Sequence, residues 1–216
     1  MLLAAGRGER LRPLTDAVPK ALVEVGGQSL LERHLVALRD AGVDTVVINL
    51  GWLGEKIMLR VGSGAKFGLQ VIYSDEGDNI LETGGGIRRA LPVLGPEPFL
   101  VVNADIYTSM PLNLALHDDV DGHLVLVPTP AFKSKGDFDL IDNRIANSEK
   151  PAYTFSGVAM YRPSFFANCE PGRFALAPML KAAAKKSALS GELYTGTWED
   201  VGTPERLERV RRSFDS

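Results

Sequence analysis

A cluster of cations and glycines near the N-terminus is the first feature that could do chemistry. Positions 7 to 20 hold four cations and two acidic residues, a charge of +2 in a chain whose net charge is -3. The cations are Arg7, Arg10, Arg12 and Lys20. Gly6 and Gly8 lie beside them, and glycine lets backbone N–H groups approach an anion closely. Such a cluster suits a polyphosphate; on charge alone, a solvated basic loop is the alternative.

Two familiar phosphate-binding motifs do not fit this cluster. A dinucleotide-binding fingerprint needs a third glycine where Leu11 stands. A Walker A loop needs Gly-Lys-Ser/Thr after a four-residue gap, and the sequence has none. The glycines by themselves are therefore as consistent with an ordinary tight turn.

Two carboxylates and a second run of glycines lie further along the chain. Asp105 directly follows the apolar run 98–103, and Asp200 lies in the segment 198–204. Taken alone, Asp105 could cap a helix and Asp200 is only a loop aspartate. The three glycines at 84–86 give a flat backbone surface where a helix opens, or simply a flexible start to that helix.

Short apolar runs alternate with helical patterns in the first half of the chain. The predicted strands are 1–5, 45–50, 69–73 and 98–103. Ser29 and Glu32 have the spacing of a capping box, so a helix begins there and ends at Gly42. Further helices are predicted at 57–61 and from Gly86 to Leu91. This alternation predicts right-handed βαβ units and a mostly parallel sheet covered on both faces.

The second half of the chain contains more strand and less helix. Strands are predicted at 123–127 and 153–161, a hairpin or flap over the site at 132–148, and a final amphipathic helix at 204–214. Ligands of open α/β sheets bind beyond the carboxyl ends of the strands, so the loops there are expected to line one crevice. These loops follow Ala5, Leu50, Tyr73 and Asn103.

Composition limits the class of protein. The chain has 216 residues, of which 45% are apolar and 24% charged, as in a single globular domain spanning 1–216. The slightly acidic balance argues against nucleic-acid binding. One cysteine, Cys169, excludes an internal disulfide, and the three histidines suit no zinc motif. We find neither a signal peptide nor an apolar run of membrane-spanning length, so we expect no membrane partner and a cytoplasmic location.

The N-terminal cluster resembles a long family signature. Residues 3–15, followed by Pro19-Lys20-Ala21-Leu22, are similar to the N-terminal motif of the sugar-1-phosphate nucleotidylyltransferases, with Ala21 replacing the usual proline. The resemblance implies an α/β, Rossmann-like nucleotidyltransferase fold with a mixed, mostly parallel central sheet and a small flap or hairpin. It also implies an NTP-binding half at about 1–110 and a sugar-binding half at about 111–216.

The same resemblance implies roles for individual residues. Arg10 would grip the leaving pyrophosphate, and Lys20 would lie at the phosphates that exchange, which makes these two the candidate catalytic residues. The candidate nucleotide-binding residues are Ala4, Ala5, Gly6, Gly8, Glu9, Arg10, Lys20, Thr83, Gly84, Gly85 and Asn103. The candidate sugar-binding residues are Asn103, Gly136, Asp137, Glu149, Ser156 and Gly157.

A magnesium ion is the implied cofactor. The segment Asn103-Ala104-Asp105 resembles the family's Asn-Gly-Asp, and 198–203 resembles its late Trp-x-Asp-Val-Gly-Thr signature. Asp105 and Asp200 would then hold Mg²⁺, which prefers one or two carboxylates together with substrate phosphates.

Four segments narrow the resemblance to the short bacterial N-acetylmuramate 1-phosphate uridylyltransferases. They are 81–86, 136–138, 154–157 and 198–203. UTP and N-acetylmuramate (MurNAc) α-1-phosphate are the implied substrates, and Lys133 and Lys135 are the candidate cations for the lactyl carboxylate. A monomer or small homo-oligomer is expected. The alternatives are another sugar-1-phosphate nucleotidylyltransferase, a phosphocholine cytidylyltransferase, or a non-catalytic nucleotide-sugar sensor.

Overall fold

The computed structural model describes residues 1–77 and 79–214. Its strands are β1 (Leu2–Leu3), β2 (Glu24–Val25), β3 (Gln28–Ser29), β4 (Thr45–Leu50), β5 (Gln70–Asp75), β6 (Phe99–Asn103), β7 (Ile106–Thr108), β8 (Gly122–Pro128), β9 (Asp139–Ile141), β10 (Arg144–Ala146), β11 (Tyr153–Tyr161), β12 (Leu189–Leu193) and β13 (Trp198–Asp200). Its α-helices are α1 (Leu14–Ala17), α2 (Leu30–Asp40), α3 (Gly54–Val61), α4 (Glu82–Leu94), α5 (Leu176–Lys185) and α6 (Pro204–Arg212). Within these residues, no helix has the length and apolar character needed to cross a membrane.

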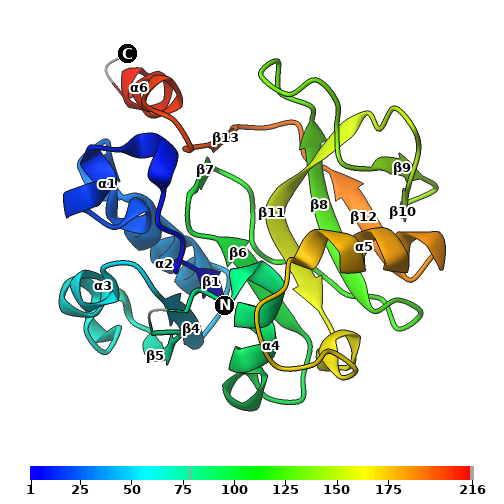
Figure 1. The fold of residues 1–216 in the computed structure, drawn as a ribbon, viewed down its shortest axis with the longest axis horizontal. Helices are drawn as coiled ribbons and strands as arrows, with labels where there is room; N and C mark the ends of the chain where they lie inside the picture. The colour runs from blue at the N-terminus through cyan, green and yellow to red at the C-terminus, as the bar shows by residue number, and fades with distance from the viewer. Residues whose placement is uncertain (78, 215–216) are drawn as a thin grey trace.

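A mixed sheet of nine strands runs through the described chain in the order β5-β4-β1-β6-β11-β8-β12-β10-β9 (Figure 1). The strands β5, β4, β1 and β6 are parallel, and Leu2 lies between Ile48 and Val102 in the register. β11 is antiparallel to both β6 and β8, so it joins the two halves of the chain in one sheet. The predicted α/β fold with a mixed central sheet is confirmed.

Helices cover both faces of the sheet, as strands that are apolar on both sides require. Leu31 of α2 packs with Ile48 in a core on one face, to which α3 also contributes. Ile87 of α4 and Leu180 of α5 pack with Val101 in a core on the other face. In Figure 1, α4 and α5 lie in front of the sheet and α2 lies behind it.

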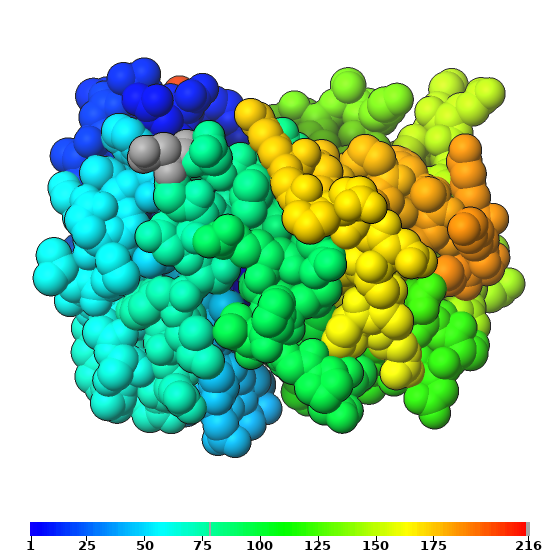
Figure 2. Space-filling model, turned by 60° about the horizontal axis from the view of Figure 1, so that its bottom comes forward, coloured from blue at the N-terminus to red at the C-terminus, as the bar shows by residue number. Residues whose placement is uncertain are grey.

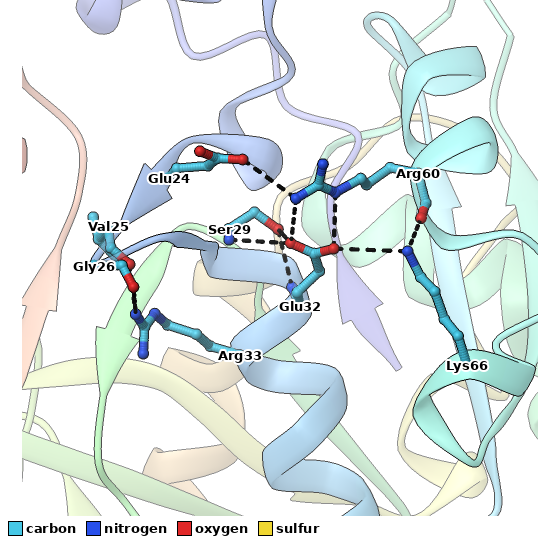
Figure 3. Close-up of polar contacts among 8 residues, drawn as sticks. All are labelled: Glu24, Val25, Gly26, Ser29, Glu32, Arg33, Arg60 and Lys66. Atoms are coloured by element: carbon cyan, nitrogen blue, oxygen red, sulfur yellow. Dashed lines mark hydrogen bonds and ion pairs between the residues drawn. The ribbon is translucent and has the colours of Figure 1, made fainter.

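The beginning of α2 is fixed by the predicted capping box. Ser29 Oγ accepts a hydrogen bond from Glu32 N at 3.3 Å, and Ser29 N donates to Glu32 Oε2 at 3.2 Å. Arg60 of α3 donates to both carboxylate oxygens of Glu32, at 2.8 and 3.0 Å (Figure 3). Burial acts to raise the pKa of Glu32, but hydrogen bonds from Arg60 and Ser29 outweigh it and lower the pKa from 4.5 to about 2. This carboxylate therefore ties α2 to α3.

The start of α4 differs from the prediction. The helix begins at Glu82 and not at Gly86. The backbone oxygen of Phe174 accepts from Gly84 N and Gly85 N, both at 3.1 Å, and so satisfies donors that the first turn of a helix leaves free. Figure 2 shows the yellow segment around 170–175 lying against the green surface of α4. The helix start was mispredicted because this partner lies far away in the sequence.

The polar segment 132–148 contains the predicted hairpin. Its strands, β9 and β10, pair with each other, and Arg144 of β10 lies opposite Ser190 of β12. The hairpin therefore extends the edge of the main sheet.

The last helix packs against the N-terminal cation cluster. Thr203 Oγ1 accepts from Arg206 N at 3.4 Å and Pro204 is the first helical residue, as the sequence predicts. Leu207 of α6 shares a small core with Leu11. The last helix is thus held against the loop that follows β1, beside the carboxyl edge of the sheet.

Candidate active site

A crevice opens at the carboxyl ends of β1, β4, β5 and β6, where the sequence predicts a ligand site. Its walls come from the loops after these strands and from the start of α4. Several predicted site residues line it: Ala4, Ala5, Gly6, Lys20, Thr83, Asn103 and Asp105. The fold therefore brings together the first two glycine-rich motifs and the first carboxylate.

The loop after β1 is held in one shape by contacts at Gly8. Gly8 has a φ of 69°, and its backbone oxygen accepts from Thr15 Oγ1 at 2.8 Å and from Leu11 N at 2.9 Å. A Cβ on Gly8 would lie 3.0 Å from Lys20 Cβ, so glycine permits both the turn and the close approach. Glu9 and Arg10 follow on the exposed side of a 3-10 turn.

Lys20 lies between the two predicted metal-binding carboxylates. Its Nζ donates to Asp105 and lies 3.8 Å from Asp200 Oδ1. The strands β7 and β13 produce this meeting, because Ile106 pairs with Asp200 and Val201 N donates to Asp105 O at 3.0 Å. The side chain of Lys20 is only 11% exposed, so its charge lies in a shielded position.

The two carboxylates fit a magnesium ion. Asp105 and Asp200 already face one cation, the ammonium of Lys20. Among the described residues, no group of three or more His, Cys, Asp or Glu side chains is placed to hold a metal. Substrate phosphate oxygens would have to complete the coordination, which is the arrangement that Mg²⁺ commonly adopts.

A second pocket of about 400 Å³ adjoins the crevice and shares Asn103 and Asp105 with it. Its remaining lining residues are Arg10, Ile106, Phe132, Lys133, Thr154, Phe155, Ser156, Trp198, Asp200 and Arg206. Gly202 leaves room for two cations beside it, since a Cβ there would lie 2.4 Å from Arg206 and 2.9 Å from Arg10. The predicted metal site thus lies where the two pockets meet.

Arg206 is a site residue that the sequence reasoning missed. It is only 5% exposed, and its guanidinium donates to Asp200 Oδ2 at 2.9 Å. The ring of Phe132 covers the guanidinium, with 4.3 Å between its centre and the guanidinium carbon. An arginine in the first turn of an amphipathic helix is usually exposed to solvent, so the sequence pattern did not indicate that Arg206 belongs to the site.

Gly157 makes room for Asn103. It has a φ of 85°, and a Cβ there would lie 2.6 Å from Asn103 Nδ2. The neighbouring Ser156 is buried, its Oγ accepts from Val158 N, and its backbone oxygen accepts from Trp198 Nε1 at 2.9 Å. These two predicted sugar-binding residues shape the wall around Asn103.

The other predicted sugar-binding residues lie outside this wall. Asp137 accepts from Lys133 Nζ at 2.8 and 3.0 Å and from Phe155 N at 3.0 Å. Gly136 approaches a backbone oxygen so closely that a Cβ would lie 2.4 Å from it. Glu149 is exposed in a turn. Across 1–77 and 79–214, Gly136, Asp137 and Glu149 are not among the residues that line either pocket.

The glycines of α4 pack against other parts of the chain. A Cβ on Gly84 would meet the ring of Phe174 at 2.4 Å, and one on Gly85 would meet Gly172 O at 2.2 Å. Thr83 precedes them and lines the crevice directly. The close packing of α4 on 172–174 therefore requires residues without side chains at these positions.

A buried polar network under the crevice was also missed. Ala4 N donates to Asn49 Oδ1, Asn49 Nδ2 donates to Glu76 Oε1, and Glu76 Oε2 accepts from Leu81 N, each at 2.7 Å. Asn49 and Glu76 are both buried and both line the crevice. The network joins three loops, and a polar residue inside the apolar run 45–50 was the one available signal.

His34 and Cys169 make contacts away from the two pockets. His34 Nε2 lies 2.9 Å from Ile106 O, and burial lowers the pKa of His34 to about 4. Cys169 Sγ lies 3.7 Å from Met179 Sδ. Among the described residues, neither His34 nor Cys169 lines the two pockets. The chemistry available at the site is therefore that of cations and carboxylates.

Comparisons with known proteins agree with this geometry. The family model of the MobA-like NTP transferase domain matches residues 1–136. An N-acetylmuramate alpha-1-phosphate uridylyltransferase of Neisseria meningitidis is 43% identical over 98% of this chain and 96% of its own length. A protein of the same name from Caulobacter vibrioides is 33% identical, with 95% and 92% covered.

Solved structures show the same fold at low sequence identity. HddC from Yersinia pseudotuberculosis superposes with a TM-score of 0.80 and 22% identity, covering 99% of this chain and 97% of that one. The inositol-1-phosphate CTP transferase from T. maritima superposes with a TM-score of 0.78 and 18% identity, covering 100% and 95%.

Proposed function

Because this chain belongs to the family of MobA-like NTP transferase domains and sugar-1-phosphate nucleotidylyltransferases, we propose that it transfers UMP from UTP to MurNAc α-1-phosphate and releases pyrophosphate. The uridylyltransferases that match it over nearly its whole length support the choice of base and sugar.

One observation carries the proposal on the structural side. The crevice and the second pocket share Asn103 and Asp105, and Lys20 lies against Asp105 at that junction. A donor in the crevice and an acceptor in the second pocket would meet beside Lys20. Group transfer between two bound anions needs such a junction, with cations that offset their charge.

The crevice is the proposed nucleotide site. Arg10 would bind the departing pyrophosphate, and Lys20 would stabilise charge on the phosphates that exchange. The proposed contacts of the nucleotide are Ala4, Ala5, Gly6, Gly8, Glu9, Thr83, Gly84, Gly85 and Asn103. An oxygen of the sugar phosphate attacks the α-phosphorus in line, and the bond to the β-phosphate oxygen breaks. The attacking oxygen is already ionised, so no side chain needs to remove a proton.

Asp105 and Asp200 are the proposed holders of Mg²⁺. The ion, when bound, would offset charge on phosphate oxygens. The protein's own part is to hold the two carboxylates: Val201 N fixes the backbone of Asp105, and Arg206 fixes the side chain of Asp200. Lys20 offsets part of the charge of the pair.

The second pocket is the proposed sugar site, with Asn103, Ser156 and Gly157 in its wall and Gly136, Asp137 and Glu149 as the outer proposed contacts. MurNAc carries a lactyl carboxylate that needs a cation. Lys133 lines the pocket, but both oxygens of Asp137 already accept from its ammonium. The guanidinium of Arg206 pairs with Asp200 through one N–H, its other N–H groups have no hydrogen-bond partner among the described residues, and the ring of Phe132 lies over it. A planar guanidinium matches a carboxylate, so we assign the lactyl group to Arg206.

Residues 1–216 are proposed to form one domain, with the nucleotide half at about 1–110 and the sugar half at about 111–216. We also propose a cytoplasmic location for the enzyme.

A pyrophosphate-release screen tests the function. The four NTPs are each combined with MurNAc 1-phosphate, other sugar 1-phosphates and phosphocholine, with Mg²⁺ present. We expect release to be fastest with UTP and MurNAc 1-phosphate. Faster release with another acceptor would replace the proposed sugar, and nucleotide binding without release in any combination would indicate a sensor.

A further inference from the structure

The cations of the N-terminal loop differ in what they contact. Arg12 Nε is 2.7 Å from Asp16, and Lys20 contacts Asp105. Across the described residues, Arg7 and Arg10 form no ion pair with a carboxylate. Arg10 already has a proposed role at the pyrophosphate, which leaves Arg7 as a second loop cation that pairs with no carboxylate in the part of the chain that the structure describes.

Arg7 is held against Trp52 from the next loop of the sheet. The guanidinium carbon of Arg7 lies 4.3 Å from the centre of the Trp52 ring, and Arg7 Nε is buried with no hydrogen-bond partner in the described chain. Stacking on an aromatic face orients a guanidinium and leaves its in-plane donors free for a ligand. An arginine that is oriented by stacking and has unpaired N–H donors can bind an anion beside the loop.

Trp52 is itself fixed to the same loop at two points. Its backbone N donates to Ala5 O at 3.3 Å, and its indole Nε1 donates to Thr15 O at 2.9 Å. Thr15 in turn donates to the backbone oxygen of Gly8. Trp52 is therefore tied to the loop by its backbone at Ala5 and by its indole at Thr15, and the indole ring lies against Arg7.

We propose that Arg7 is a further ligand of the β- and γ-phosphates of the donor, and that Trp52 is the residue that positions it. The inference rests on the proposed nucleotide-dependent activity. The ligand chemistry is that of a pyrophosphate group, which presents paired anionic oxygens to a planar guanidinium. The sugar and base make no part of this contact.

The reverse reaction gives the sharpest test, because it separates pyrophosphate from the rest of the nucleotide. We expect Arg7→Met to raise KM for pyrophosphate, and KM for UTP in the forward direction, about 10-fold or more, the typical loss of a charge-assisted hydrogen bond. KM for the UDP-sugar should stay within about twofold of the wild type. Arg12→Met is the matched control and should leave all three values unchanged.

Trp52 variants test the positioning role. Trp52→Leu should raise the same two KM values, and the double variant Arg7→Met/Trp52→Leu should be little worse than either single variant, because both remove one contact. Trp52→Phe keeps the stacking ring and should fall between wild type and Trp52→Leu. An Arg7→Met enzyme with unchanged KM for pyrophosphate, or with KM for the UDP-sugar raised equally, would overturn the proposal.

A direct binding measurement keeps this test separate from that of the proposed function. Calorimetric titration with magnesium pyrophosphate should show weaker binding to Arg7→Met, and an intermediate affinity for Arg7→Lys, with melting temperatures near that of the wild type. If the wild type binds pyrophosphate and transfers no nucleotide, the activity fails while the Arg7 contact stands. If Arg7→Met and Arg7→Lys both bind pyrophosphate as tightly as the wild type, the Arg7 contact fails.

Discussion

The ammonium of Lys20 donates to the carboxylate of Asp105 across 85 positions of sequence. One partner follows the N-terminal loop and the other follows β6, so the contact exists only when the sheet is formed. It joins the cation of the proposed nucleotide site to a carboxylate of the proposed metal site, and several expected effects follow from it.

Removing either carboxylate should affect turnover more than folding. Asp105 and Asp200 are partly exposed, and each faces Lys20. We expect Asp105→Asn and Asp200→Asn each to lower kcat sharply in steady-state assays over a range of Mg²⁺ concentrations, with little change in Tm. Because both would serve one ion, the double variant should be far from additive. A fully active Asp105→Asn enzyme would remove the metal assignment.

Removing the cations should likewise impair catalysis more than stability. Lys20→Ala and Arg10→Ala each lose a proposed charge-assisted phosphate contact, worth about 1.5–3 kcal/mol or roughly 10–150-fold in kcat/KM. Arg12→Ala, whose partner is Asp16, is the matched control and should change kcat/KM little. If either variant kept its kcat/KM and lost much of its Tm, that residue would be structural.

The choice between two sugars tests Arg206 against the flap lysines. We compare kcat/KM for MurNAc 1-phosphate with that for N-acetylglucosamine (GlcNAc) 1-phosphate, which lacks the lactyl carboxylate. Arg206→Gln should reduce this ratio about 10-fold or more, whatever it does to both rates through Asp200. Lys133→Ala/Lys135→Ala should leave the ratio nearly unchanged, because Asp137 holds Lys133.

The sugar comparison has its own control and contrary outcomes. Arg209 lies on the same helix and pairs with Glu199, so Arg209→Gln should keep the wild-type ratio. If only the lysine variant lost the preference for MurNAc 1-phosphate, the lactyl carboxylate would be assigned to the lysines instead of Arg206. Equal use of both sugars by the wild type would remove the MurNAc assignment.

The Glu32 network should contribute measurably to stability. Glu32→Gln removes the buried one of the two carboxylates that pair with Arg60 and should lower the free energy of unfolding by about 1–3 kcal/mol at pH 7. The pKa of Glu32 is about 2 in the folded protein against 4.5 ordinarily, so its contribution is present above pH 4.5 and is lost as the pH falls towards 2. Urea unfolding should therefore show a smaller deficit for the variant in acid. Glu24→Gln, which removes an exposed contact to Arg60, is the control.

His34 should make the stability of the fold sensitive to acid at higher pH than Glu32 does. Its pKa is lowered from 6.5 to about 4, so the unfolded chain binds a proton there that the folded chain does not. Its stabilising effect is complete above pH 6.5 and is lost towards pH 4, by up to about 1.4 kcal/mol per pH unit. His34→Gln should flatten urea-unfolding stability in that range, whereas His117→Gln, at an exposed position, should not.

The sequence predicted features that local spacing determines. Ser29 and Glu32 cap α2 three residues apart, Thr203 and Pro204 begin α6, and the polar residues after β1 and β6 meet at one edge because parallel strands end together. The family resemblance supplied the pairing of Asp105 with Asp200, which spacing alone did not.

The features that the sequence did not predict depend on contacts between segments that are far apart in the chain. Glu76 reaches Asn49 only when β4 and β5 pair, and the first turn of α4 forms on the backbone oxygen of Phe174. Arg206 lines the second pocket because it pairs with Asp200 and packs against Phe132, which comes from another part of the chain. Spacing within a single element carries no information about such partners.

The chain's two tryptophans are intrinsic fluorophores, one beside each of the two proposed substrate sites. Trp52 lies against the loop after β1, and Trp198 lines the second pocket, where its indole donates to the backbone oxygen of Ser156. Indole emission responds to charge and water nearby, so Trp198→Phe leaves a fluorophore that reports on the nucleotide, and Trp52→Phe leaves one that reports on the sugar phosphate. Mixing each variant with one substrate at a time resolves the order in which the two pockets fill, without any added label.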